Sequence, residues 1–267
     1  EEIDQTVVRC GEMAFWWLGQ HSFAIKFSSG LIYVDPYLSD SSARNIPPLL
    51  PPHKIGNPLF ILGTHNHSDH IDKPVWEIIA SHSSATYFVV PEKFRYLLSQ
   101  ELQISLDRFI GLNDGMSFEM AGIRVTGIGA AHELLDIDPI TGLHSFLGYV
   151  IECDGIAVYH AGDTCIYEGL QTKLKRWQFD VIFLPINGRD AERLRRNCIG
   201  NMTYQEAADL AGVLSPRLTI PAHFDMFRGN SEDPQKFVDY MNVKYPALET
   251  MICKHGKIVR IGKRKNE

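Results

Sequence analysis

Short apolar runs separated by turn residues dominate the first part of the chain. Met13–Leu18, Ser22–Phe27 and Leu31–Asp35 have the length and the apolar or alternating pattern of strands. Gly19-Gln20-His21 and Ser28-Ser29-Gly30 separate these runs and have the composition of turns. The pattern therefore predicts consecutive strands at the start of the chain.

A proline-rich segment, Tyr37–Pro58, interrupts this pattern. It contains Pro47-Pro48 and Pro51-Pro52, and such pairs resist regular secondary structure. Strand-like sequence resumes at once with Leu59–Gly63. The segment is therefore expected to be a long surface loop or lid within one domain, and not a linker between two.

Further short, largely apolar runs are also expected to be strands. They are Leu59–Gly63, Thr86–Val90, Ser117–Ile128, Phe146–Glu152, Ile156–His160, Val181–Pro185 and Leu218–Ala222, and Met251–Ile261 is expected to form a closing hairpin.

Helix-start signals lie between these strands. A helix is expected after Asp72 as N-cap with Pro74 in its first turn, another over Glu92–Gln100, and another after Asp233-Pro234. Thr203–Leu214 is expected to be helical, with a capping box formed by Thr203 and Glu206. Strand clusters with helices between them indicate an α/β domain of helix-covered sheets, and we expect a single domain over residues 1–267.

Composition narrows the class of protein. The formal net charge of −6 gives no sign of a broad nucleic-acid-binding surface, so a nucleic-acid partner is not expected. The odd number of five cysteines, without a Cys-x-x-Cys pair, favours a reducing compartment. The chain has no apolar run of about 18 residues and its first residues are polar, so we expect a cytoplasmic protein with no membrane partner. A homo-oligomer remains compatible with this composition.

The segment His65-Asn66-His67-Ser68-Asp69-His70 carries the strongest chemical signal. It directly follows an apolar strand and contains three imidazoles and a carboxylate, which are ligands for Zn²⁺, Mn²⁺ or iron. In extended backbone His65 and His67 point the same way and can face one ion. Asp69 and His70 can face a second ion. The alternative is a histidine-rich polar surface loop.

Three further candidate ligands follow predicted strands: His132, Asp163 and His223. Gly162 allows a tight turn beside Asp163, and the two oxygens of that carboxylate can bridge two ions. Each of these residues taken alone is compatible with an ordinary polar strand end, but together with the six-residue motif they indicate a metal centre. Cys165 is a weaker candidate, because the set of histidines and aspartates is complete without it.

The order His-x-His-x-Asp-His, then His, then Gly-Asp, then His resembles the metallo-β-lactamase superfamily. The resemblance implies a four-layer αββα sandwich with two divalent metal ions at one edge, between the sheets. It also implies that one ion is held by His65, His67 and His132, the other by Asp69, His70 and His223, and that Asp163 bridges them.

A narrower resemblance concerns the ascorbate-6-phosphate lactonase-like branch. The segments similar to it are Trp17–Phe23, Tyr33-Val34-Asp35-Pro36, Pro185–Arg189 and Gly200–Thr203. This resemblance implies that the substrate is a small, anionic, phosphorylated lactone and that manganese is the ion.

The expected chemistry is hydrolysis by a metal-bridged hydroxide, because two ions about 3.5–4 Å apart lower the pKa of a shared water toward ~7. Asp69 or a bound water would protonate the leaving oxygen, and Asp163 would fix the spacing of the ions. Arg189 and the helix start after Asn201 could bind a phosphate, although the arginines of residues 189–196 could instead pair with Asp190 and Glu192. His21 is a candidate substrate contact, and for His21 and His160 we favour a role in orienting ligands.

Three other functions compete with this hypothesis. A phosphodiesterase acting on nucleotides or RNA ends could use the same pair of ions. A di-iron oxidoreductase is disfavoured, since proteins of that kind on this fold carry Glu at the position of His67. A non-catalytic metal-binding module would not need the complete ligand set.

Overall fold

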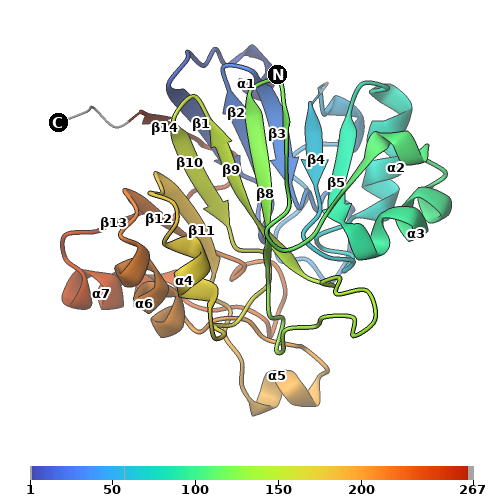
Figure 1. Ribbon diagram of the computed structural model, residues 1–267. Helices are drawn as coiled ribbons and strands as arrows, with labels where there is room; N and C mark the ends of the chain where they lie inside the picture. Colours follow the sequence, from blue (N-terminus) through green and yellow to red (C-terminus); the bar gives the residue numbers. More distant parts are fainter. Residues whose placement is uncertain (1, 57, 264–267) are drawn as a thin grey trace.

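The computed structural model describes residues 2–56 and 58–263 and contains two seven-stranded mixed sheets (Figure 1). The first sheet has the order β14-β1-β2-β3-β4-β5-β6. Its strands are β1 (Glu12–Trp17), β2 (Phe23–Phe27), β3 (Gly30–Val34), β4 (Phe60–Leu62), β5 (Tyr87–Pro91), β6 (Phe109–Leu112) and β14 (Ile258–Gly262).

The second sheet has the order β13-β12-β11-β10-β9-β8-β7. Its strands are β7 (Ser117–Met120), β8 (Ile123–Gly129), β9 (Leu147–Cys153), β10 (Ile156–His160), β11 (Val181–Pro185), β12 (Leu218–Ala222) and β13 (Glu249–Thr250). Sequence analysis gives the bounds of β10, β11 and β12 correctly, because turn residues flank these short apolar runs.

The two sheets pack face to face through aromatic side chains. Phe15 and Phe23 of the first sheet contact Phe183 of the second, with ring centroids 5.1 and 4.1 Å apart. Alternate residues of β1, such as Trp16, point to the opposite face and join a separate hydrophobic cluster that includes Trp76. Strands covered on both faces read as continuous apolar runs, which explains the sequence of β1.

Helices cover the outer face of each sheet, so the predicted αββα sandwich is confirmed (Figure 1). The first sheet is covered by α2 (Lys73–His82) and α3 (Glu92–Leu102), and the second by α4 (Leu170–Leu174), α6 (Tyr204–Leu214) and α7 (Pro234–Lys244). The expected capping box of Thr203 and Glu206 is present at α6, and Asp233 caps α7. Two short helices, α1 (Glu2–Gln5) and α5 (Ala191–Arg195), complete the α-helices of the described residues, and the 3-10 helix η2 (Leu106–Arg108) precedes β6.

Two of the expected strand assignments are wrong. The run Ser117–Ile128 is two strands, because Ala121 and Gly122 adopt positive φ values of 53° and 75° and form a turn. Met251–Ile261 is not a hairpin, since β13 pairs with β12 while β14 pairs with β1. The end of the chain therefore crosses from the second sheet to the first, and no local pattern distinguishes this crossing from a hairpin.

The described part of the proline-rich loop, residues 37–56 and 58, is irregular as expected, apart from the 3-10 helix η1 (Pro52–Lys54) and an isolated β-bridge between Arg44 and Phe227. Asp72 occupies the N-cap position directly before α2, as expected, but its carboxylate makes no cap hydrogen bond to the helix. It accepts instead from the backbone N–H groups of Leu38 and Ser39, at 2.9 and 2.7 Å, and from the Ser39 hydroxyl at 2.6 Å. The role of Asp72 is therefore to anchor the loop.

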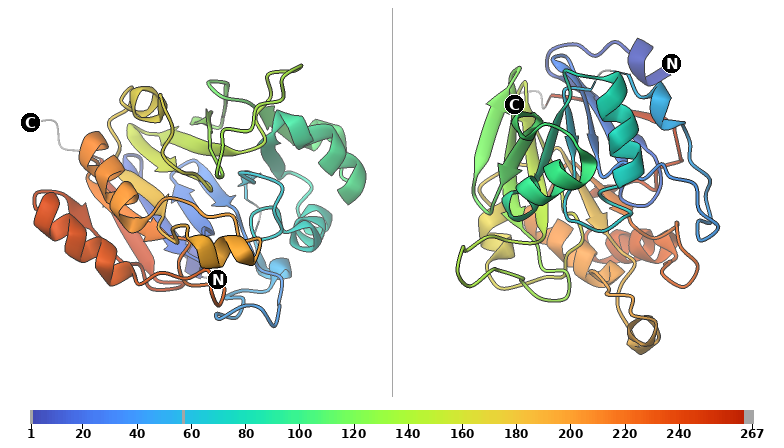
Figure 2. Two further views of the ribbon diagram at one scale, coloured as in Figure 1. Left: turned by 90° about the horizontal axis from the view of Figure 1, so that it is seen from below. Right: turned by 90° about the vertical axis from the view of Figure 1, so that its right-hand side faces the viewer.

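No helix in residues 2–56 and 58–263 combines the length and the apolar character that a bilayer crossing requires. At one end of the sandwich, loops that follow several strands come together with α5. In the view from below, α5 lies in front of the strand ends (Figure 2). These loops carry the residues that sequence analysis singles out.

Candidate metal centre

The structure brings the candidate ligands into connected groups. His65, His67 and His132 form one group, and Asp69, His70 and His223 form another. Within each group the ligand atoms lie within 4.8 Å of one another. A further group, His65, His70 and Asp163, joins these two, so the spatial arrangement has room for two neighbouring ions. His21, Asp35 and His160 form a fourth group, which is completely buried behind them.

Asp163 lies between the two groups. Its Oδ1 atom is 3.3 Å from Nε2 of His70 and 3.1 Å from Nε2 of His223. Its Oδ2 atom faces the other way and is 3.9 Å from Nε2 of His132. Each oxygen therefore faces a different group, as a bridging carboxylate requires.

Unpaired buried atoms indicate that this cluster suits a metal ion. His70 Nε2 and Asp163 Oδ1 are buried, and neither forms a hydrogen bond with any described residue. Buried polar atoms without partners are costly, and ligation of a cation would satisfy both. His67 is exposed, and Asp69 is partly exposed, so the cluster opens to solvent on their side.

Asp35 supports the cluster from behind, and sequence analysis does not assign it a role. This fully buried carboxylate accepts from the N–H and hydroxyl groups of Thr64 at 2.8 and 2.7 Å. Its Oδ2 atom is also 2.6 Å from Nδ1 of His70. Such a contact fixes the ring and leaves Nε2 facing Asp163. The available signal was an aspartate directly after β3, in the run Tyr33-Val34-Asp35-Pro36.

Asn201 is placed behind His132. The side chain of Asn201 is completely buried, with Oδ1 3.0 Å from Nδ1 of His132. Its Nδ2 donates to Oδ1 of Asn187 at 3.1 Å. The expected phosphate contact is therefore not the contact that this amide makes here, and its position instead suits orientation of His132.

Gln20 is a second supporting residue without an expected role. Its Nε2 donates to Oδ2 of Asp69 at 2.7 Å and lies 3.1 Å from Nε2 of His223. Its backbone N–H donates to Asp225 at 3.0 Å, and the other oxygen of Asp225 is 2.6 Å from Nε2 of His255. The turn between β1 and β2 is thus connected to the C-terminal part of the chain.

His21 is completely buried, so the structure does not place it where a substrate would touch it. Its Nδ1 is 3.8 Å from Oδ1 of Asp163, and its ring lies against that of His160 at a centroid distance of 4.0 Å. Burial lowers the pKa of His21 to about 4, so the ring is neutral. Of the two expected roles, the position suits support of a ligand.

Cys165 is buried, and burial raises the pKa of its thiol. It lies outside the ligand groups found among the described residues. Its Sγ contacts the carbonyl oxygen of Gly200 at 3.7 Å. A buried thiol with a raised pKa is a weak nucleophile, which agrees with the preference for a metal-based mechanism.

Several residues at or next to the cluster have a left-handed backbone conformation. Gln20, Asp35, Glu133 and His223 have positive φ values of 52°, 47°, 69° and 59°. This conformation is uncommon for residues other than glycine and persists where the surrounding structure enforces it. Two of these residues contact ligands, one is a ligand and Glu133 directly follows one.

The arginines of residues 189–196 are paired. Arg189 donates to both carboxylate oxygens of Glu206 at 2.6 Å and to the carbonyl oxygen of Asn201 at 3.0 Å. Arg193 pairs with Asp190, and Arg195 pairs with Glu192 at 2.7 Å. The alternative of an internally paired charged loop therefore describes this arrangement better than a ready phosphate site.

We expect Arg189→Ala to lower the free energy of unfolding by about 1 kcal/mol, because it removes a half-exposed ion pair next to the α6 capping box. The Michaelis constants for anionic and neutral substrates should then change by similar factors. Urea unfolding and steady-state kinetics would measure both effects. A selective rise in KM for phosphorylated substrates would instead restore the phosphate-binding role.

The histidines divide into two classes by charge. Burial lowers the pKa values of His65 and His132. The pKa of His67 is also lowered, by desolvation of the part of its ring that faces the cluster and by the charge of His70, although the residue as a whole is exposed. These three rings are therefore neutral and ready to bind a cation. Burial acts in the same direction on His70 and His223, but the nearby carboxylates of Asp163 and Asp69 together outweigh it and raise both pKa values, with Asp35 contributing at His70. Without metal, both rings therefore favour the protonated form more than an ordinary histidine does.

Binding of the second ion should consequently release protons. Since His70 and His223 must lose protons to bind a cation, affinity should rise with pH by about tenfold per unit for each proton released. The affinity for the ion at His65, His67 and His132 should depend much less on pH. Calorimetry in buffers of different ionisation enthalpy would count the protons. His70→Ala should remove the pH-dependent phase, and two pH-independent phases would contradict the assignment.

Comparison with known proteins gives consistent matches. A family model described as "Beta-lactamase superfamily domain" matches residues 31–224. A protein named "UPF0173 metal-dependent hydrolase" from Caldivirga maquilingensis is 28% identical over 246 residues, which cover 92% of this chain and 96% of that protein. Its namesake from Thermococcus onnurineus is 29% identical, with 92% and 98% covered.

A solved structure has the same fold. It is Igni18, described as a novel metallo hydrolase from Ignicoccus hospitalis, with a TM-score of 0.73 and 21% sequence identity. The alignment covers 95% of this chain and 100% of that chain. At this identity the similarity concerns the fold.

Proposed function

This chain belongs to the β-lactamase superfamily, and from that premise we propose that it is a metal-dependent hydrolase with two divalent ions, Zn²⁺ or Mn²⁺. The proposal is supported by two relatives that are named metal-dependent hydrolases. Their alignments with this chain cover nearly the whole length of each relative. The observation that carries it is the position of Asp163, whose two oxygens face separate groups of ligands.

We propose that His65, His67 and His132 hold one ion, that Asp69, His70 and His223 hold the other, and that Asp163 bridges them. Bound divalent ions would lower the pKa of water and polarise the carbonyl or phosphoryl group of the substrate. The residues of this chain fix the geometry: Asp35 orients His70, and Asn201 orients His132.

Asp69 is our proposed proton carrier. Its Oδ2 atom accepts from Gln20, and the side chain is partly exposed on the open side of the cluster. In the metal-free site, burial by itself raises the pKa of Asp69, but the charges of His70 and His223 outweigh burial and lower it. A bound cation would replace those charges and act in the same direction. An ionised carboxylate here can take up a proton released by water and pass it to the leaving oxygen.

We propose an ester or lactone as the reacting group. The similarity to the ascorbate-6-phosphate lactonase-like branch supports a lactone, and a phosphorylated, anionic one is the finer form of this proposal. The phosphate group is proposed separately from the lactone, because the expected phosphate ligand Arg189 forms an ion pair with Glu206. The same centre is compatible with phosphodiester hydrolysis, so both classes belong in the test.

The test starts with protein stripped by a chelator and reloaded with Zn²⁺ or Mn²⁺. Elemental analysis should find up to two ions per chain, and His70→Ala should retain one. Turnover of a panel of neutral lactones, phosphorylated lactones, carboxylic esters and phosphodiesters should appear only after reloading. Saturation at one ion in both proteins would contradict the two-ion site. Oxygen consumption by iron-loaded protein, without hydrolysis, would favour the di-iron oxidoreductase.

A further inference from the structure

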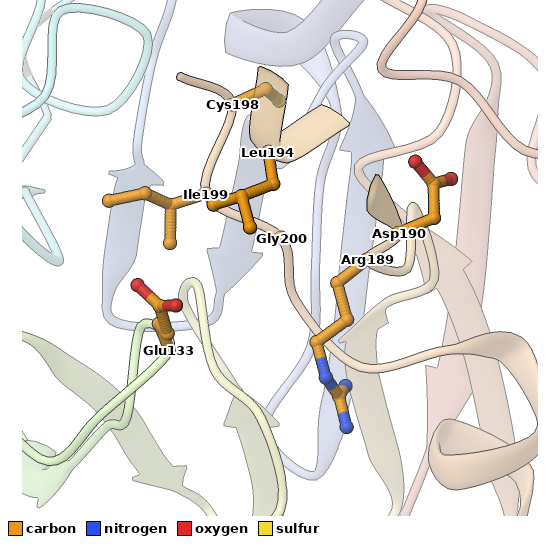
Figure 3. A pocket seen from close by; sticks show the side chains of 7 residues that line it. All are labelled: Glu133, Arg189, Asp190, Leu194, Cys198, Ile199 and Gly200. Atoms are coloured by element: carbon orange, nitrogen blue, oxygen red, sulfur yellow. The ribbon is translucent and has the colours of Figure 1, made fainter. Parts of the chain in front are cut away.

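We infer that a pocket beside the ligand cluster selects a small, apolar, uncharged part of the substrate. The inference rests on the proposed hydrolase function. The pocket has a volume of about 220 Å³ (Figure 3). Residues 189–200 form a segment that we call the α5 arm. The pocket is lined by Glu133 and by six residues of this arm: Arg189, Asp190, Leu194, Cys198, Ile199 and Gly200.

Chain connectivity places this pocket next to the cluster. Glu133 directly follows His132, and Gly200 directly precedes Asn201, whose Oδ1 is 3.0 Å from Nδ1 of His132. Cys165 joins the two walls, because its N–H donates to Ala131 at 2.7 Å and its Sγ contacts Gly200. A substrate that reacts at the ligand cluster can therefore extend a short group into the pocket.

The pocket offers a poor site for an anion. Glu206 holds the Arg189 guanidinium, which points away from Leu194 and Cys198 (Figure 3). Asp190 and Arg193 neutralise each other on the arm. The exposed Glu133 carboxylate points toward Ile199 and would repel a second negative charge (Figure 3). A phosphate or carboxylate entering here would lose water without gaining a cation.

Apolar side chains on the arm provide the attraction. Leu194 is 62% exposed and Ile199 is 39% exposed, although both are large hydrophobic residues. Cys198 and Gly200 add uncharged surface beside them. Exposed apolar surface in a concave site commonly marks a ligand position, and burying it releases water from both partners. The volume suits a chain of a few carbons.

A matched pair of esters tests the charge preference. 4-Nitrophenyl butyrate and 4-nitrophenyl hemisuccinate share a leaving group and differ in a terminal methyl or carboxylate. With reloaded protein we expect kcat/KM for butyrate to exceed that for hemisuccinate by about tenfold or more. Equal values, or a preference for hemisuccinate, would overturn the inference.

Three variants locate the preference. Leu194→Asp should lower kcat/KM for butyrate about threefold to tenfold. It should leave kcat/KM for 4-nitrophenyl acetate nearly unchanged, because the acetyl group is too short to reach the pocket. Glu133→Gln should raise kcat/KM for hemisuccinate about threefold and not that for butyrate. Val243→Asp is the control, because Val243 is also exposed but lies on α7. Equal losses on acetate and butyrate in Leu194→Asp would remove the pocket from substrate selection.

Binding separates this inference from the proposed function. Butanehydroxamate and its analogue with a terminal carboxylate can be titrated into metal-loaded protein by calorimetry, without any turnover. Tighter binding of the neutral compound, weakened by Leu194→Asp, would support the pocket even if no ester were hydrolysed. Equal binding would overturn it even if hydrolysis were found. A change in sedimentation of Leu194→Asp with unaltered selectivity would assign this surface to contact between copies of the chain.

Discussion

Replacement of Asp163 by alanine is expected to lower kcat/KM at least about a thousandfold, which corresponds to about 4 kcal/mol of transition-state stabilisation. The reason is geometric: Oδ1 faces His70 and His223, while Oδ2 faces His132. Loss of one carboxylate therefore removes a ligand from both groups and the element that sets their separation. The chain should still fold, because the hydrophobic clusters of the two sheets do not depend on this side chain.

Circular dichroism, elemental analysis and kinetics on the same preparation would measure these effects. Asp163→Asn is a useful second variant, because it preserves shape while removing the charge. Asp209→Ala serves as the control, since Asp209 pairs with Lys244 at the surface between α6 and α7. A folded Asp163→Ala protein with near-normal kcat and full metal content would show that Asp163 does not bridge.

Asp35→Asn is expected to weaken binding of the ion at Asp69, His70 and His223 by about tenfold to a hundredfold. Oδ2 of Asp35 is 2.6 Å from Nδ1 of His70, and an amide NH₂ at that position cannot accept a hydrogen bond from the ring N–H. Asparagine tolerates the positive φ of 47° at this position, so the backbone need not change. The unfolding free energy should also fall, by about 1–3 kcal/mol.

The diagnostic feature is selectivity between the two ions. Calorimetric titration should show the phase assigned to His65, His67 and His132 preserved while the other weakens. Asp180→Asn is a matched control, because Asp180 is also buried but accepts from the backbone of Ala157, outside the metal-ligand groups. If both variants lost the same affinity for both ions, the effect of Asp35 would be one of general stability.

The sequence alone predicts most of the secondary structure and the principal ligand candidates. Apolar runs give β10, β11 and β12 their bounds, and the capping box gives α6 its start. These features are local, since each depends on residues within a few positions of one another. The six-residue run from His65 to His70 is equally local, and its mixture of imidazole and carboxylate already indicates metal chemistry.

The local sequence pattern does not predict which strands pair when they lie far apart in the sequence. Met251–Ile261 looks like a hairpin because two apolar runs flank His255-Gly256. In the structure, β14 pairs with β1, more than two hundred residues away in sequence. The free energy that decides between these arrangements comes from burial against the rest of the sheet, which the segment itself does not encode.

The same distinction applies to the site. The sequence by itself determined which side chains could bind metal, because ligand chemistry belongs to the residue. Only the tertiary structure decided that Asp35 and Gln20 support His70 and Asp69, that Asn201 lies behind His132, and that Glu206 engages Arg189. A carboxylate, an amide or a guanidinium has no fixed role in sequence, since its role depends on the partner that folding places within hydrogen-bonding distance.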